Sequence, residues 1–220
     1  MTAVRRTSPW RANGLSLVLA GVFLACLVGQ VWTGHLAFNA EQARNGQAAI
    51  GLATYLGSGH FLSALFENWE SEFLQMGMYV LLTVSLRQRG SAESRPMPGE
   101  HEDERVDRGP TPWPVRAGGV WRRLYANSLS IALLVLFAMA FAGHAYESWR
   151  MEVAERVYAG EAAPTLGDHL ASAQFWFESM QNWQSEFLAV LALVVLSIFL
   201  RQDKSPQSKP LEAPHGQTGT

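Results

Sequence analysis

The stretch Leu134-Val-Leu-Phe-Ala-Met-Ala-Phe-Ala-Gly143 contains no charged residue and no polar stripe at helical spacing. A helix on the surface of a soluble protein carries such a stripe, so a soluble bundle of buried helices is the weaker alternative. The stretch lies in an apolar run from Leu129 to Tyr146, interrupted only by His144, and a comparable run extends from Leu15 to Trp32. Each run makes a helix of roughly 27 Å, close to the thickness of a bilayer core.

Two shorter apolar runs, Phe73–Leu86 and Phe187–Leu200, are extended on their N-terminal side by the aromatic segments Phe61–Trp69 and Phe175–Trp183. With these segments included, each is long enough to span a bilayer. The sequence therefore predicts an all-α integral membrane protein with four transmembrane helices, at about 15–32, 66–86, 128–146 and 180–200.

The sequence repeats itself. Asn68-Trp-Glu-Ser-Glu-Phe-Leu recurs as Asn182-Trp-Gln-Ser-Glu-Phe-Leu, and Asn13-Gly-Leu-Ser recurs as Asn127-Ser-Leu-Ser, both at an offset of 114 (182 − 68 = 127 − 13 = 114). A fixed offset over a whole hairpin indicates duplication. Each copy holds two predicted spans, so the copies form a parallel repeat of two hairpins. The first run could also be a signal peptide after a basic start, but its mid-chain counterpart favours a retained helix.

The basic residues predict the orientation. Fourteen of them lie on the side of the termini and the linker, against Arg44, Arg150 and Arg156 on the other side. The positive-inside rule then places both termini in the cytoplasm. The predicted order is a cytoplasmic N-terminus (1–12), hairpin one (13–88), a disordered cytoplasmic linker (89–119), hairpin two (120–202) and a disordered cytoplasmic tail (203–220).

The connections within the hairpins are predicted to be partly helical and to form an extracytoplasmic cap. Gly160 suits the C′ position of the helix that continues the third span, and Gly46 holds the same place in copy one. Thr165-Leu-Gly-Asp168 resembles a capping box, which predicts that the last helix runs from about 166 to 200.

The recurring Asn-Trp-x-Ser-Glu-Phe motif is the best candidate site. Glu72 and Glu186 are expected several Å inside the outer membrane boundary, where a carboxylate suggests function. They could face each other and handle an ion or a proton, or they could only hold helices together. The predicted intramembrane polar cluster comprises Asn68, Trp69, Ser71, Glu72, Asn182, Trp183, Ser185 and Glu186.

Other chemistry is not predicted. The histidines near the outer side, among them His144 and His169, show no paired metal-ligand spacing and are expected to be solvated or interfacial. The sequence contains no phosphate-binding loop, dinucleotide fingerprint or nucleophile motif, so no catalytic, cofactor-binding or metal-binding residue is predicted. The single Cys26 permits no intrachain disulfide, and a net charge of −2 does not indicate nucleic acid binding.

The motifs Asn39-Ala-Glu-Gln, Ser58-Gly-His-Phe and Phe66-Glu-Asn-Trp-Glu-Ser-Glu-Phe-Leu-Gln-Met resemble a family of bacterial multi-pass membrane proteins classed only as a domain of unknown function. The resemblance covers roughly residues 11–95 and, more weakly, 120–205. It implies a bacterial inner-membrane location and supplies no activity. Copy two departs from the motifs where Gln184 replaces Glu70.

The functional expectation is a non-enzymatic scaffold or accessory subunit of the inner membrane. Its partners would be the lipid bilayer and a protein or a second copy of the chain, without cofactors. The alternative is a small transporter or channel that uses Glu72 and Glu186.

Overall fold

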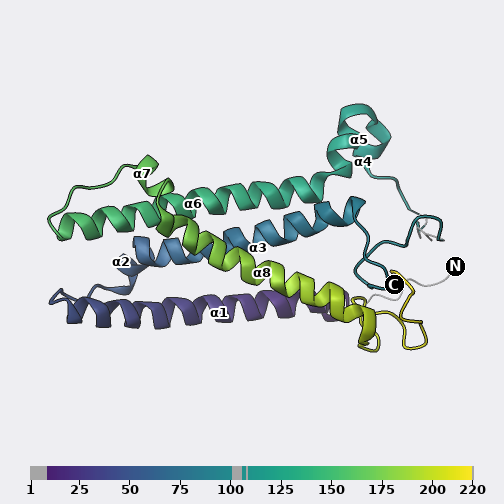
Figure 1. Cartoon of the computed structure of the whole chain (residues 1–220), viewed down its shortest axis with the longest axis horizontal. Coiled ribbons are helices and arrows are strands. Elements are labelled where there is room, and N and C mark those ends of the chain that lie inside the picture. Colours follow the sequence, from purple (N-terminus) through teal and green to yellow (C-terminus); the bar gives the residue numbers. More distant parts are fainter. Residues whose placement is uncertain (1–8, 101–105, 108, 220) are drawn as a thin grey trace. The chain divides into compact units, whose positions relative to one another are not determined.

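The computed structural model describes residues 9–100, 106–107 and 109–219 (Figure 1). Arg5, Arg6, Arg105 and Arg108, on which the predicted orientation partly depends, lie outside this part. The described residues are helical, as predicted, and contain no strand. The helices are α1 (Pro9–Arg44), α2 (Leu52–Leu56), α3 (Gly59–Ser85), α4 (Trp113–Ala117), α5 (Gly119–Ala126), α6 (Ser128–Tyr158), α7 (Leu166–Leu170) and α8 (Ala173–Phe199).

Within the described part, three helices are long and apolar enough to cross a membrane: α1 from Ala12, α6 and α8. The remaining long helix, α3, has 27 residues, but Glu67, Glu70 and Glu72 fall in its N-terminal half. The chain therefore has the composition of a membrane protein. The polar half of α3 needs partners inside the fold, because lipid offers none.

The chain divides into two compact units, and the boundary between them along the sequence falls within α3, after Leu62. In the first unit, the His35 ring is hydrogen-bonded to the backbone oxygen of Ile50 (2.8 Å), which ties α1 to the loop before α2. The ring of Tyr55 on α2 is buried close to Gly34, where a Cβ would meet the tyrosine hydroxyl oxygen at 2.3 Å. An aromatic ring thus docks α2 on a glycine of α1.

In the second unit, α3, α6 and α8 pack together. Gly143 of α6 lies against the ring of Phe66 on α3. Gln75 of α3 donates to the backbone oxygen of Glu186 on α8 (3.1 Å). Small residues and side-chain amides are the usual means by which membrane helices approach one another.

Helix boundaries recur at the spacing of the sequence repeat. α7 begins and ends 114 residues after α2 (166 − 52 = 170 − 56 = 114), and α8 does the same relative to α3 (173 − 59 = 199 − 85 = 114). The predicted C′ glycines are confirmed, since Gly46 and Gly160 both have positive φ (72° and 76°). The predicted last helix is interrupted, because Ser172 accepts a hydrogen bond from Phe175 N–H and starts α8 separately from α7.

The described parts of the linker and the tail contain hydrogen-bonded turns. The disorder that composition predicts for these segments stays a prediction. The sequence Arg-Gln-x-x-Ser-x-x-Ser, followed by Arg or Lys and then Pro, comes after both α3 and α8. In each copy the second serine accepts a hydrogen bond from the glutamine N–H, as Ser94 does from Gln88 (3.0 Å) and Ser208 from Gln202 (2.9 Å).

The tail is also joined to the linker. The buried ammonium of Lys209 donates to the backbone oxygens of Gly90, His215 (2.9 Å) and Gln217 (2.9 Å). Thr218 accepts from the N–H of Gly90 (2.9 Å). Serine hydroxyls and one lysine make the contacts of these turns, and such bonds from side chain to backbone are typical of turns.

The predicted capping box of Thr165 and Asp168 is confirmed and starts α7. The hydroxyl and the backbone N–H of Thr165 donate to the Asp168 carboxylate (2.7 and 3.0 Å), and these bonds hold the pKa of Asp168 below its usual value. A carboxyl with a lowered pKa stabilises the fold above its usual pKa. This contribution is lost as the pH falls through the lowered value.

We therefore expect the backbone amides of α7 to lose protection when the pH falls below the usual pKa of an aspartate. The measurement is hydrogen exchange by mass spectrometry, with rates corrected for intrinsic exchange. Thr165→Ala should reduce protection at neutral pH and weaken its pH dependence, because the backbone N–H at this position still donates to Asp168. Equal protection of the parent chain at both pH values would contradict this account.

Candidate functional site: a buried carboxyl–imidazole pair

The predicted polar cluster separates into two kinds of residue. Asn68, Ser71 and Ser185 bond within their own helix, to Ala64 O (2.7 Å), Asn68 O (2.8 Å) and Asn182 O (2.8 Å). Asn182 and Trp183 bond across helices instead. Asn182 donates to Glu67 (2.5 Å) and Trp183 to Glu70 (3.1 Å). Trp69 is half-buried on α3.

The two glutamates favoured by the sequence are less enclosed. Glu72 is exposed and Glu186 half-buried, and they are close enough for their charges to interact. Neither carboxylate accepts a hydrogen bond from a side chain in the part of the chain that the structure describes. They lie beside the enclosed site and do not form its centre.

The centre is Glu70 on α3 and His144 on α6, the buried pair. Both side chains are fully buried (0% exposed). Glu70 Oε2 lies 3.0 Å from His144 Nδ1, and the other carboxylate oxygen accepts from the indole N–H of Trp183 on α8. A proton lies between the acid and the imidazole whichever of them carries it. The pair therefore joins three helices around one exchangeable proton.

Two buried polar atoms at this site have no partner among the described residues: His144 Nε2 and Ser179 Oγ. Ser179 is one helical turn from Phe175, whose ring contacts the His144 ring (5.1 Å between centroids), and one turn from Trp183. It therefore faces the buried pair from α8. Buried groups without partners cost about 1–3 kcal/mol each, so each of the two atoms calls for an explanation.

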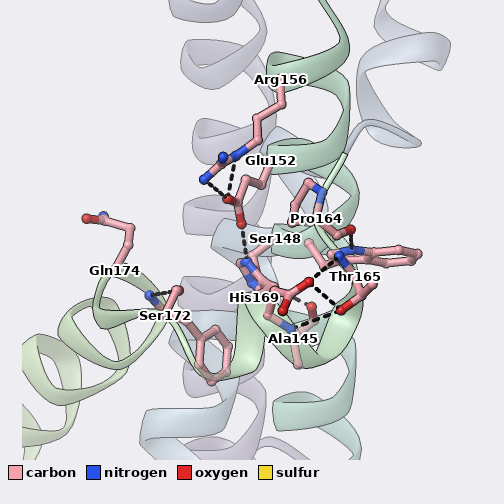
Figure 2. Close-up of polar contacts among 12 residues, drawn as sticks. Ala145, Ser148, Glu152, Arg156, Pro164, Thr165, His169, Ser172 and Gln174 are labelled. Carbon is pink, nitrogen blue, oxygen red and sulfur yellow. Dashed lines mark hydrogen bonds and ion pairs between the residues drawn. The ribbon is translucent and has the colours of Figure 1, made fainter. Parts of the chain in front are cut away.

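A second polar constellation, the outer triad, consists of Ser148, Glu152 and His169 (Figure 2). It joins α7 to α6. Glu152 Oε2 lies 2.6 Å from His169 Nδ1, and Ser148 Oγ lies 2.8 Å from His169 Nε2. The ring of Phe175 contacts the imidazoles of both His169 (5.3 Å) and His144. Phe175 thus lies between the outer triad and the buried pair.

His144 and His169 are not solvated as one alternative predicted, because both are buried (0% and 5% exposed). Their position at the membrane interface stays a prediction. Among the described residues, no three histidine, cysteine, aspartate or glutamate side chains are grouped closely enough to hold a metal ion.

A signal for the buried pair is present in the sequence as a departure from the repeat. Glu70 corresponds to Gln184, and His144 corresponds to Gln30. Each copy thus contributes one titratable group at a position where the other copy has an amide. A search for identities between the copies highlights Glu72 and Glu186 and overlooks these differences.

A family model described as a domain of unknown function (DUF6766) matches residues 6–220. The chain belongs to the DUF6766 family. No curated protein and no solved structure matches it. The match covers both copies, the linker and the tail, so the buried pair and the outer triad both lie within the DUF6766 region.

Proposed function

We propose that this DUF6766 chain is a four-span bacterial inner-membrane protein with both termini in the cytoplasm, α2 and α7 in an extracytoplasmic cap, and α3 as the fourth span. The excess of basic residues around the termini and linker supports the orientation. The cross-helix bonds of Glu67 and Glu70 support the inclusion of α3, since they give partners to carboxylates that lipid would leave unpaired.

Within this arrangement, the protein moves protons through the buried pair, and it is not an enzyme. The observation that carries this proposal is the unpartnered Nε2 of His144, in a fully buried ring already bonded to Glu70. An imidazole with one nitrogen bonded and the other unengaged can receive a proton on one side and release it on the other. A purely structural histidine would have both nitrogens satisfied.

Glu67 and Ser179 extend the site. Glu67 lies near enough to His144 for their charges to interact, and the Ser179 hydroxyl supplies a further donor and acceptor. Glu72 and Glu186 add two further carboxyl groups next to each other on α3 and α8.

The test is proton flux into liposomes that contain the purified full chain and a pH-sensitive dye, driven by a potassium diffusion potential. We expect acidification of the lumen by the parent chain and its loss in Glu70→Gln, because glutamine keeps the acceptor for Trp183 but cannot exchange a proton. Glu155→Gln, on an exposed position of α6, is the matched control and should retain the flux. Absence of flux from the parent chain, or full flux from Glu70→Gln, would refute the proposal.

A scaffold or accessory subunit is the second candidate. The side-chain bonds that tie α8 to α3, from Asn182 and Trp183, favour it because such bonds rigidify a bundle. Its test is a detergent pull-down with the tagged full chain. A stoichiometric protein partner, or a second copy of the chain, together with no proton flux, would support this function over transport.

A further inference from the structure

We infer that the outer triad, Glu152–His169–Ser148, is the site at which protons enter and leave the buried pair from the outer side of the membrane, with Phe175 as the barrier between them. This inference rests on the proposed function. It assigns a proton-exchange role to residues that the buried pair does not itself require.

The direction of the hydrogen bonds shows how many protons the triad holds. Ser148 Oγ lies 2.7 Å from the backbone oxygen of His144, which can only accept. The single hydroxyl proton is therefore donated to that carbonyl, and both bonds of Ser148 are made only if His169 Nε2 carries a proton and donates it to Ser148. This polarity is the reverse of a hydrolytic triad, in which the histidine accepts the serine proton.

A second proton lies on the other side of the same ring. His169 Nδ1 and Glu152 Oε2 are 2.6 Å apart, a distance that requires a proton between them. With Nε2 already protonated, the Glu152–His169 couple holds one proton more than a neutral imidazole beside an ionised carboxylate. This geometry is that of a proton-loaded triad.

The surroundings of the triad suit exchange with water. Glu152 is a quarter exposed, and Arg156 on α6 pairs with its other oxygen (2.9 Å), while His169 is nearly buried. Asp168 on α7 is held by Thr165, and from α8 the ring of Phe175 contacts His169. Figure 2 shows Arg156, Glu152, His169 and Ser148 following one another in a single file.

The path inward follows α6. In the first step, the Glu152–His169 couple takes up a proton from the water on the outer side. On the way inward Nε2 passes its proton to the Ser148 hydroxyl, which releases its own proton toward His144 Nε2, one helical turn away on the same face. The Phe175 ring touches both imidazoles, so it must move for this transfer to occur.

Copy one shows that the docking of the short helix does not require the triad. The positions equivalent to Ser148, Glu152 and His169 are Gly34, Phe38 and Tyr55. There the Tyr55 ring packs on Gly34 and on Phe38 (5.8 Å between centroids), without a carboxyl–imidazole couple. In copy one this ring contact and the bond from His35 to the loop before α2 hold the five-residue helix without a carboxyl–imidazole couple, so the couple in copy two serves another purpose.

The experiment transplants the contact of copy one into copy two. Ser148→Gly with His169→Tyr should preserve the docking of α7 and abolish proton flux in the same liposome assay. The control is the reverse exchange, Gly34→Ser with Tyr55→His, which should retain the flux. Ser148→Ala removes only the hydroxyl and should also lose the flux. It tests the same role if the double variant does not fold.

The outcomes separate this inference from the proposed function. Full flux in both copy-two variants, with flux lost in Glu70→Gln, would overturn the role of the triad and leave the buried pair in place. Absence of flux in the parent chain would overturn both. Covalent labelling of Ser148 by a fluorophosphonate would identify a nucleophile and would also overturn the proton-exchange role.

Discussion

Glu70→Ala is expected to lower the free energy of unfolding by about 3–5 kcal/mol, the range for breaking a buried, hydrogen-bonded charge pair by removing one partner. The change leaves His144 without the bond to its Nδ1, in a ring whose Nε2 has no partner among the described residues. It also removes the acceptor of the Trp183 indole on α8. The measurement is reversible denaturation in detergent micelles, followed by tryptophan fluorescence.

A double substitution separates the loss of bonding from the loss of charge. Glu70→Gln with His144→Gln puts in both positions the amide that the opposite copy carries, at Gln184 and Gln30. Amides can still bond to each other and to Trp183, so the double variant should recover most of the stability lost in Glu70→Ala. It should nevertheless show no proton flux. A stability loss below about 1 kcal/mol for Glu70→Ala would mean that the pair contributes no more than an ordinary hydrogen bond.

The helical architecture could be predicted from the sequence because its causes are local. Apolar runs of bilayer length predict long helices, and α1, α6 and α8 have the required length and composition. The glycines at 46 and 160 and the capping box at Thr165 depend only on nearby backbone groups, and all three are observed. Local signals of this kind need no knowledge of which helices touch.

The interruption between α7 and α8 was not predicted, although its cause is also local. The segment from 166 to 200 has helical composition, and residues 171–172 contain neither glycine nor proline. The Ser172 hydroxyl accepts from Phe175 N–H and gives the backbone an alternative to continuing the helix. Serine permits both outcomes, so the sequence alone does not decide between them.

The buried pair could not be predicted, because its two groups are 74 residues apart. Helical spacing shows which residues share a face, but not which face of α3 meets α6. The repeat also favours positions that are identical in both copies. Glu72 recurs as Glu186, yet it is exposed, while the unrepeated Glu70 is fully buried. The differences between the two copies thus mark the proposed proton site, and the identities between them do not.

Gly143→Ala is expected to destabilise the second unit by about 1–3 kcal/mol through overpacking. A Cβ at Gly143 would meet the Phe66 ring atoms Cγ and Cδ2 at 2.7 Å, and these atoms are close to the backbone of α3 and cannot swing aside freely. The helices α3 and α6 must then move apart at this contact. Because Gly143 precedes His144 and Phe66 lies one turn before Glu70, the separation should also lengthen the bond between Glu70 and His144.

Gly77→Ala is the matched control at the same helix contact. Its Cβ would lie 3.4 Å from the Leu134 side chain, an ordinary contact, so the change should be neutral or stabilising by up to about 1 kcal/mol through helix propensity. Phe66→Ala, which removes the clashing Cγ and Cδ2 atoms, should partly restore the proton flux lost in Gly143→Ala. Equal stability of Gly143→Ala and Gly77→Ala would show that α3 and α6 do not approach closely at Gly143. The packing that brings Glu70 to His144 would then have to be assigned to other contacts.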